Sequence, residues 1–241
     1  MTSDTRPLRL ALFDLDHTLL PLDSDYEWGE FTIRIGWNDP VEFARRNGEF
    51  YAHYQAGTLN VHDYVRFATE AVRLRGPEAS AAAHAQFMRE VIGPAIKPQA
   101  RDLVRQHQAA GDTVLIVTAT NEFVTRPIAH ALGVADDALL AVQLALDPLT
   151  GWYTGEIDGV PTMREGKVRR MEEWLAAHQL GWADVDSTFY SDSMNDVPLL
   201  EKVNHPVATN PDPRLRALAQ ERGWRILDLF PQTEASQDSA S

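Results

Sequence analysis

The chain has 241 residues, of which 44% are hydrophobic and 24% charged, with a formal net charge of -13 and no cysteine. This composition is typical of an ordinary globular protein, and the acidic balance argues against a nucleic-acid partner, which would need a basic face on the protein. The lack of cysteine excludes disulfides, thiolate metal sites and a cysteine nucleophile.

The N-terminal segment shows no targeting signal. Arg6 and Arg9 precede an apolar run that Asp14 soon interrupts. This pattern fits neither a signal peptide nor a membrane span. We therefore expect a cytoplasmic protein with no membrane partner.

The first predicted element is a short buried strand from Leu10 to Asp14, and acidic residues follow its apolar part. Side chains two positions apart on a strand tend to project to the same side, so Asp14 and Asp16 should lie close together. Two such carboxylates repel each other unless a cation lies between them or one holds a proton. Taken alone, the run through Thr18 fits a reactive site and a simple polar turn equally well.

A helical stretch rich in aromatic residues follows, from about Leu22 to Gly93. Short connections between roughly four helices predict a small bundle with an aromatic core. Helix starts are expected at Asp23 or Ser24, at Asn38-Asp39-Pro40, at Asn60 and at Gly76-Pro77, and stops at Gly36, Gly57 and Gly93.

From Pro98 onward, predicted strands and helices alternate. The expected elements are a helix over 98–108, a strand over 113–117, a helix over 121–132, a hairpin of 139–146 and 152–157, a helix over 164–178, a strand over 187–191, a helix over 197–203 and a strand over 206–209. Residues from about Pro231 to Ser241 are polar and expected to be disordered. The alternation predicts an α/β fold: a Rossmann-like parallel sheet with helices on both faces, plus an inserted α-helical bundle.

Polar residues at further element ends fit one site at the carboxyl edge of this sheet. Thr118 and Ala119 would offer a hydroxyl and backbone amides at a helix start, which suits a phosphate. Asp192 and Asp196 add carboxylates, the ligands that Mg²⁺ prefers. Lys167 stands near a helix start, where a cation opposes the helix dipole unless an anion is nearby. Each has an ordinary explanation alone, as a cap, a turn or a surface lysine, but together they predict one site.

This order of residues resembles the haloacid dehalogenase (HAD) superfamily of aspartate-nucleophile phosphatases, subfamily IB, the phosphoserine-phosphatase-like branch. The four motifs read here as Asp14-Leu15-Asp16-His17-Thr18, Thr118, Lys167 and Asp192-Ser193-Met194-Asn195-Asp196. The helical insert, the hairpin before Lys167 and the run Asn210-Pro211-Asp212-Pro213 are also similar to that branch. The resemblance covers nearly the whole chain and implies a catalytic core of residues 1–21 and 94–230, a helical cap domain over 22–93 and a tail over 231–241.

The resemblance also implies roles for the motif residues. Asp14 would be the nucleophile that forms an aspartyl-phosphate, and Asp16 would act as general acid and then as general base. Mg²⁺ would be held by Asp14, the backbone carbonyl of Asp16 and Asp192. The activity implied is Mg²⁺-dependent hydrolysis of a small phosphorylated metabolite.

The remaining motif residues would bind the phosphate or support those that do. Thr118, Ala119 and Lys167 would hold the phosphoryl oxygens. Asn195 would orient the phosphate or the metal ligands, and Asp196 would anchor Lys167 or the outer shell of the metal.

The substrate is less sharply indicated. Enzymes of this branch specific for phosphoserine bind the substrate amine with a glutamate nine residues after the nucleophile, a position that Asp23 occupies here. With Asp25, Glu27 and Glu30 it forms an acidic entrance that fits a substrate with an ammonium group, such as phosphoserine or histidinol phosphate. A solvated first helical turn, where acids are favoured, explains the same residues equally well.

Two departures argue against strict phosphoserine specificity. Ala119 and Thr120 stand where the phosphoserine enzymes usually have glycines, and the amine position holds the shorter aspartate. Arg45, Arg66 and Arg73 are all candidates for binding a substrate carboxylate.

Two other functions use a similar set of residues. A phosphotransferase or mutase would pass the phosphoryl group from the same nucleophile to a second hydroxyl instead of water. A signalling module phosphorylated on aspartate, like a receiver domain, also places acids at strand ends. However, its acceptor lies on a later strand and it has no inserted helical block, so Asp14 on the first strand weighs against it. The sequence does not predict the oligomeric state.

Overall fold

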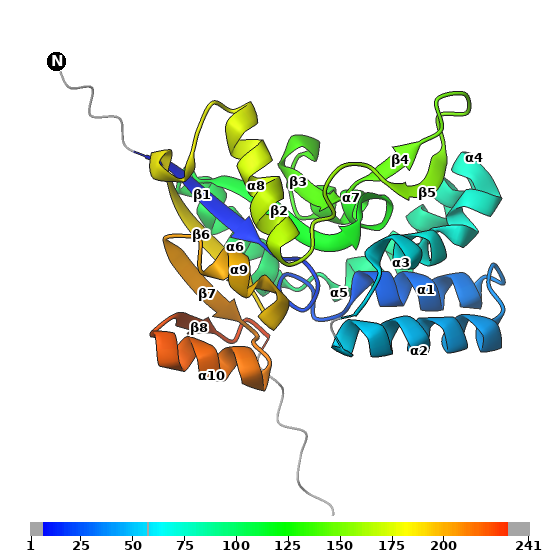
Figure 1. Cartoon of the computed structure of the whole chain (residues 1–241), viewed down its shortest axis with the longest axis horizontal. Coiled ribbons are helices and arrows are strands. Elements are labelled where there is room, and N and C mark those ends of the chain that lie inside the picture. The colour runs from blue at the N-terminus through cyan, green and yellow to red at the C-terminus, as the bar shows by residue number, and fades with distance from the viewer. Residues whose placement is uncertain (1–6, 57, 231–241) are drawn as a thin grey trace, which may run out of the picture.

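The protein is described by a computed structural model that covers residues 7–56 and 58–230 (Figure 1). The helix stop expected at Gly57 and the polar tail from Pro231 to Ser241 lie outside these described residues. Within them, no helix combines the length and apolar character needed to cross a membrane.

A six-stranded sheet in the order β3-β2-β1-β6-β7-β8 forms the core, and every neighbouring pair in it is parallel. The strands are β1 (Leu8–Phe13), β2 (Thr113–Asn121), β3 (Leu139–Val142), β6 (Val185–Ser191), β7 (His205–Thr209) and β8 (Arg225–Leu227). Strand β1 lies in the middle, with Leu10 opposite Thr113 of β2 and Ser187 of β6. The strand order reverses at β1, which is where open α/β sheets place their sites.

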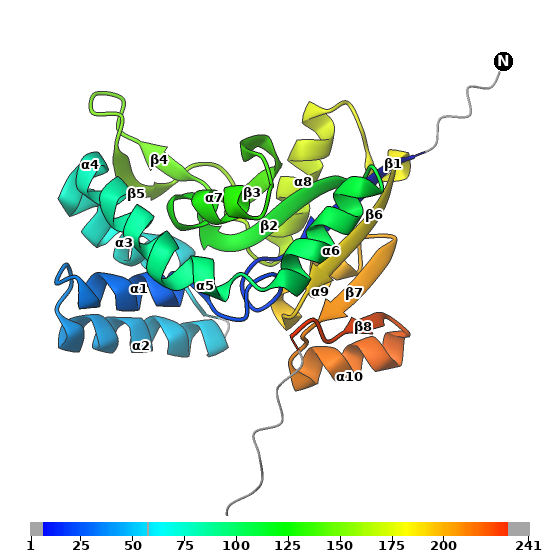
Figure 2. The ribbon, with the colours of Figure 1, turned by 180° about the vertical axis from the view of Figure 1, so that it is seen from behind.

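Helices cover both faces of the sheet, because the side chains of each buried strand alternate between two apolar cores. Ala11 and Phe13 of β1 face the core that includes α6 (Pro98–Ala109) and α7 (Glu122–Ala131), in front in Figure 2. Leu10 and Leu12 face the core that includes α8 (Glu165–Ala177), α9 (Val197–Leu200) and α10 (Pro213–Arg222). The predicted fold class is confirmed.

A block of helices is inserted between β1 and α6, and we call it the helical insert. It consists of α1 (Ser24–Arg34), α2 (Pro40–Ala56), α3 (Val61–Ala68), α4 (Glu70–Phe87), a π-helical turn (Met88–Ile92) and α5 (Gly93–Ala95). Asp23 and Asn60 cap α1 and α3, as predicted, by accepting hydrogen bonds from backbone N–H groups.

The helix is interrupted within α4 at Gly76, which has φ 76° and ψ 176°, and a second helical segment begins at Pro77, so the helix start predicted at Gly76-Pro77 is confirmed. The helix stop predicted at Gly93 is wrong. Gly93 does not end a helix; the helical conformation continues through α5 to Ala95.

The prediction of one hairpin over 139–157 is wrong in its first arm. Leu139–Val142 forms β3 and pairs in parallel with β2, Leu139 lying opposite Ile116. Only β4 (Leu144–Leu146) and β5 (Tyr153–Ile157) form the antiparallel hairpin. All four residues of β3 are buried, and a continuous apolar run of this kind is typical of a parallel sheet covered on both faces.

Three further differences lie in the core. Strand β2 continues past Val117 to Asn121, with an irregularity between them in its pairing with β3. Helix α10 and the short edge strand β8 were not predicted. Asp212, which caps α10, and Gly223, which ends it with φ 66°, are the sequence signals that mark this helix.

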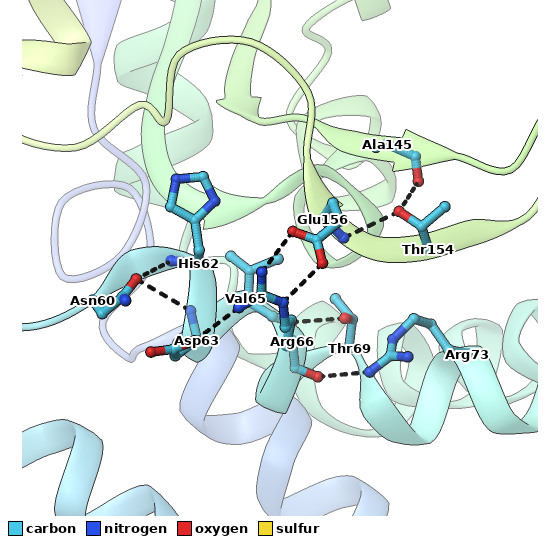
Figure 3. Close-up of polar contacts among 10 residues, drawn as sticks. All are labelled: Asn60, His62, Asp63, Val65, Arg66, Thr69, Arg73, Ala145, Thr154 and Glu156. Atoms are coloured by element: carbon cyan, nitrogen blue, oxygen red, sulfur yellow. Dashed lines mark hydrogen bonds and ion pairs between the residues drawn. The ribbon is translucent and has the colours of Figure 1, made fainter.

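The hairpin lies against the helical insert (Figure 3). The guanidinium of Arg66 on α3 donates to both carboxylate oxygens of Glu156 on β5, at 2.8 and 2.9 Å, and also to Asp63 at 2.8 Å. Arg73 donates to the backbone carbonyl of Arg66 at 3.0 Å and packs on Gly155, where a Cβ would come 2.7 Å from its Nε. Glycine at position 155 therefore allows the close approach of hairpin and insert.

Candidate active site

The chain leaves the sheet immediately before the first two acids. Strand β1 ends at Phe13, and the N–H of Asp14 still donates to the carbonyl of Tyr190 at 2.9 Å. Asp14 and Asp16 therefore lie in the turn after the strand, and the expected strand alternation does not place them. His17 is exposed and has φ 56°, a left-handed conformation within this turn.

Lys167 is a buried cation between two carboxylates. Its Nζ donates to Asp14 Oδ1 at 2.9 Å and to Asp196 Oδ2 at 2.7 Å. Burial alone would lower the pKa of Lys167, but the charges of Asp14 and Asp196 hold it above its ordinary value. Ser191 donates to Asp196 Oδ2 at 2.7 Å, a contact that the motif reading did not include.

Asp192 is fastened to the first motif through Thr18. The Thr18 hydroxyl donates to Asp192 Oδ1 at 3.2 Å and accepts from the N–H of Asp192 at 3.1 Å. Burial, together with the charges of Asp14 and Asp196, raises the pKa of Asp192 to about 9. Carboxylates forced together in this way need either a proton or a metal ion between them.

This donor set fits a divalent cation with oxygen ligands. Within residues 7–56 and 58–230, no three acidic or histidine side chains converge on one point. The ligand set expected for Mg²⁺ needs only two side chains, Asp14 and Asp192, with a backbone carbonyl from Asp16. Mg²⁺ commonly keeps water and substrate oxygens in its remaining positions, so two carboxylates suffice.

Asp16 is held on both oxygens between the core and the helical insert. Its Oδ1 accepts from the N–H of Ser24 at 2.8 Å, and its Oδ2 accepts from the Thr120 hydroxyl at 2.8 Å. Burial and the charge of Asp23 raise the pKa of Asp16 to about 8, although the Ser24 N–H opposes this. The sequence reasoning missed the contact of Thr120, although its place two residues after Thr118 could have indicated it.

Thr118 and Ala119 lie at the end of β2, as expected. Thr118 is 1% exposed, and its hydroxyl accepts from the N–H of Thr120 at 3.2 Å. Ala119 is exposed between two buried threonines. The strand end therefore presents backbone at the same edge of the sheet as the acids.

Asn195 contacts a residue that the sequence reasoning did not consider. Its Oδ1 accepts from Arg164 Nε at 3.2 Å, and Arg164 lies three positions before Lys167. The neighbour of Asn195, Asp196, holds Lys167, so this contact joins the loop before α8 to the last motif.

The acidic entrance divides into an exposed and an inner part. Asp23 is exposed, and its Oδ1 caps α1 by accepting from the N–H groups of Asp25 and Tyr26. Asp25 is half-buried, accepts a short hydrogen bond from the Tyr64 hydroxyl, and accepts from Asn121 Nδ2 at 3.4 Å. Burial raises the pKa of Asp25 to about 6. Asn121 follows Thr120 on β2, so Asp25 contacts the end of that strand.

The three candidate arginines for a substrate carboxylate all have partners within the protein. Arg66 binds Glu156 and Asp63, as Figure 3 shows, and Arg73 binds the Arg66 carbonyl. Arg45 lies on α2, where it pairs with Glu42 and Glu49 on the same exposed helix face.

Comparisons with known proteins agree with this geometry. The sequence profile of the haloacid dehalogenase-like hydrolases matches residues 11–201. A histidinol-phosphatase from Neisseria meningitidis is 40% identical over 221 residues, which cover 91% of this chain and 98% of that protein. A phosphoserine phosphatase from Mycobacterium tuberculosis is 31% identical over 226 residues, covering 91% of this chain and 70% of that protein.

Solved structures show the same fold. A protein of unknown function from Bordetella pertussis superposes with a TM-score of 0.87 and 51% identity, covering 93% of this chain and all of that one. A substrate-bound phosphoserine phosphatase superposes with a TM-score of 0.61 at 18% identity, covering 92% and 94% of the two chains, which is a likeness of fold alone. The profile and the relatives together show that the chain belongs to the haloacid dehalogenase-like hydrolase family, as a phosphatase of that family.

Proposed function

We propose that the protein is a Mg²⁺-dependent phosphomonoesterase that uses Asp14 as its nucleophile and prefers histidinol phosphate. The observation that carries the reaction type is the pairing of Asp14 with the buried ammonium of Lys167, beside an Asp16 whose pKa is raised to about 8. A carboxylate paired with a buried cation suits a nucleophile, and a carboxyl that keeps its proton near neutral pH suits a general acid.

The reaction has two steps at phosphorus. A carboxylate oxygen of Asp14 forms a bond to phosphorus while the ester P–O bond breaks, and Asp16 gives its proton to the leaving alkoxide. Water then attacks phosphorus, the Asp14–phosphate bond breaks, and Asp16 takes a proton from that water. Ser24 and Thr120 hold the Asp16 carboxyl in place for both transfers.

The other motif residues would offset the charge of the phosphate. Asp14, Asp192 and the carbonyl of Asp16 would hold Mg²⁺, which supplies positive charge to the phosphoryl oxygens when it is bound. Thr118 and the Ala119 amide would donate to these oxygens from the end of β2. Lys167 keeps Asp14 in position, and Asp196 and Asn195 support that arrangement.

Two observations support a substrate with a cationic group and no carboxylate. The relative with 40% identity over nearly its whole length is named a histidinol-phosphatase. Histidinol phosphate carries an ammonium group and an imidazole but no carboxylate, and the three candidate arginines for a carboxylate are already engaged. For the amine we favour Asp25 over Asp23, the position that the sequence pattern indicates, because Asp23 caps α1 whereas Asp25 contacts Asn121.

The test is phosphate release from histidinol phosphate, phosphoserine and p-nitrophenyl phosphate, with Mg²⁺ and with EDTA, for wild type and Asp14→Asn. We expect turnover that needs the metal, is lost in Asp14→Asn, and is fastest for histidinol phosphate. Turnover of phosphoserine at an equal or greater rate would reject the substrate assignment.

The phosphorylated products distinguish a phosphatase from the two other functions considered, a phosphotransferase and a signalling module. Transfer to an added sugar or alcohol in preference to water would indicate a phosphotransferase. A stable phosphorylated Asp14 with no turnover of any ester would indicate a signalling module.

A further inference from the structure

Arg164 has a backbone conformation that residues with a Cβ rarely adopt. Its φ is 53° and its ψ is -123°, just before the first residue of α8. The structure describes three other non-glycine residues with a similar positive φ of 47° to 59°, namely His17, Gln179 and Asn210. Such strain persists only where the surroundings impose it, and it concentrates at functional sites.

The loop around Arg164 imposes this conformation. The buried Thr162 hydroxyl donates to the carbonyl of Ala141 at 2.9 Å, which ties the loop to β3. Two residues after Arg164, a Cβ on Gly166 would come 2.0 Å from the carbonyl oxygen of Pro161, so the chain doubles back tightly here. Arg164 lies between these two fixed points.

The guanidinium of Arg164 is held by a neutral partner. Its Nε donates to Asn195 Oδ1 at 3.2 Å, and within residues 7–56 and 58–230 the structure shows no carboxylate paired with it. Arg45 and Arg66, in contrast, each bind two carboxylates. Arg164 is half-buried, so the cation is both fixed and reachable.

The site has more negative than positive charge. Asp14 and Asp196 flank a single buried ammonium, that of Lys167, which already donates to both, and Asp192 lies at the same edge of the sheet. A doubly charged phosphate entering this site is repelled unless further cations offset the acids. Arg164 is linked to this group through Asn195, the neighbour of Asp196.

We propose that Arg164 binds the phosphoryl group of the substrate, with its terminal nitrogens donating to phosphoryl oxygens while Asn195 holds its Nε. The inference rests on the proposed phosphatase reaction and adds a substrate-binding cation to it. The strained backbone then has a purpose, since it directs the guanidinium toward the last motif instead of into solvent.

The test separates binding from strain by using two variants of Arg164 and a matched control. Arg164→Gln removes the charge and the terminal nitrogens but keeps an N–H donor at the position of Nε, whereas Arg164→Gly also relieves the backbone strain. Gln179→Gly relieves a positive φ of 59° at the exposed far end of α8. Binding of inorganic phosphate in the presence of Mg²⁺ is measured by titration calorimetry, and the melting temperature of each variant is recorded.

We expect both Arg164 variants to bind phosphate roughly tenfold to a hundredfold more weakly, the effect of losing hydrogen bonds to a charged group. Arg164→Gly should melt at or above the wild-type temperature, and Gln179→Gly should bind phosphate as wild type does. Wild-type phosphate affinity in Arg164→Gln, or an equal loss in Gln179→Gly, would overturn the proposal.

Because calorimetry needs no turnover, this result does not depend on the proposed substrate. A wild-type protein that cleaves p-nitrophenyl phosphate but not histidinol phosphate would refute the substrate alone. The phosphate affinities of the two Arg164 variants would still decide the role of Arg164.

Discussion

The ammonium of Lys167 shows how closely stability and activity are linked in this site. Lys167 is 2% exposed. Among the residues that the structure describes, it is the only cation in direct contact with Asp14 and Asp196. Removing one partner of a buried ion pair leaves the other charges without compensation in a medium that solvates them poorly. A residue that would position the proposed nucleophile therefore also determines whether the core tolerates its own acids.

We expect Lys167→Met to unfold more easily than wild type by about 3–5 kcal/mol at pH 7 and to lose activity. Burial raises the pKa of Asp196 to about 6 even though the charge of Lys167 opposes the shift. Without the ammonium this pKa rises further, so the folded variant holds a proton that the unfolded chain has released. Its stability should therefore fall as pH rises above about 4, and the deficit should be smaller at pH 5 than at pH 8.

Denaturant titrations at these two pH values measure the difference for Lys167→Met. Lys202→Met is the matched control, because the Lys202 side chain is 43% exposed and lies 3.8 Å from Glu172. An equal deficit at both pH values would contradict the argument.

Asp25 gives a second prediction, with opposite effects on stability and activity. Its pKa is raised from 3.8 to about 6 by burial, with Asp23 adding to the shift and the Tyr64 hydroxyl opposing it. Between pH 4 and 6 the folded protein thus holds a proton that the unfolded chain has lost, and the stability contributed by Asp25 decreases as pH rises through this range. Asp25→Asn should therefore melt like wild type at pH 4 and above it at pH 8.

The same substitution should weaken binding of the ammonium group of the proposed substrate. We expect kcat/KM of Asp25→Asn to fall roughly tenfold to a hundredfold for histidinol phosphate, from the loss of a charge-assisted hydrogen bond. p-Nitrophenyl phosphate, which has no ammonium group, should be cleaved at the wild-type rate. Equal losses on both esters would mean that Asp25 only holds the helical insert in place.

At the scale of elements, the start of α8 depends on one close approach. The carbonyl of Pro161 occupies the space that a side chain on Gly166 would need, at 2.0 Å from the ideal Cβ position. The helix therefore begins where it does because residue 166 has no side chain. Lys167, the next residue, takes its position from this turn.

We expect Gly166→Ala to displace the start of α8, at a cost of about 1–3 kcal/mol in stability. Because Lys167 would move with it, activity should fall about a hundredfold, the loss typical of a misplacement of about 1 Å in an active site. Gly48→Ala is the control, since Gly48 lies in α2 with open space around it and alanine favours helices. Wild-type turnover in Gly166→Ala would show that the turn is more tolerant than the contact implies.

The elements that were predicted incorrectly share a physical cause. Residues 139–146 read as one apolar run, yet β3 joins the sheet and β4 joins the hairpin on either side of Gln143. Periodicity within a run does not show which partner each half will bind. The stop predicted at Gly93 is similar, because a glycine can either end a helix or lie within one, and packing decides between them.

At the scale of the whole molecule, strand order is what unites the site. Residues 14, 118 and 192 lie far apart in the sequence, but β1 is flanked by β2 and β6, so their carboxyl ends meet. The alternation of strands and helices was enough to predict this meeting. The contact of Ser24 with Asp16 could not be predicted, because it depends on how the helical insert is seated over the sheet. The contact of Thr120 with Asp16 lies within the core, where the position of Thr120 on β2 could have indicated it.

A metal bound between the ends of β1 and β6, by Asp14 and Asp192, should stabilise the entire fold. Ligand at a hundredfold excess over its Kd adds about 2.7 kcal/mol, and each kcal/mol raises Tm by about 2–4 °C for a chain of this length. We expect saturating Mg²⁺ to raise the Tm of wild type by roughly 5–10 °C. Asp192→Asn should show little of this rise, and a full rise in that variant would place the metal elsewhere.

The close contact at Gly166 also has an evolutionary consequence. No side chain fits against the Pro161 carbonyl, so glycine should be invariant at position 166 in every relative that keeps this turn, whatever its substrate. Position 164 differs, because its backbone conformation would suit glycine, so only a function of the side chain would keep arginine there. If Arg164 binds the phosphoryl group, which every ester substrate carries, an alignment of many relatives should show arginine at position 164 beside the invariant glycine at position 166, whatever the substrate.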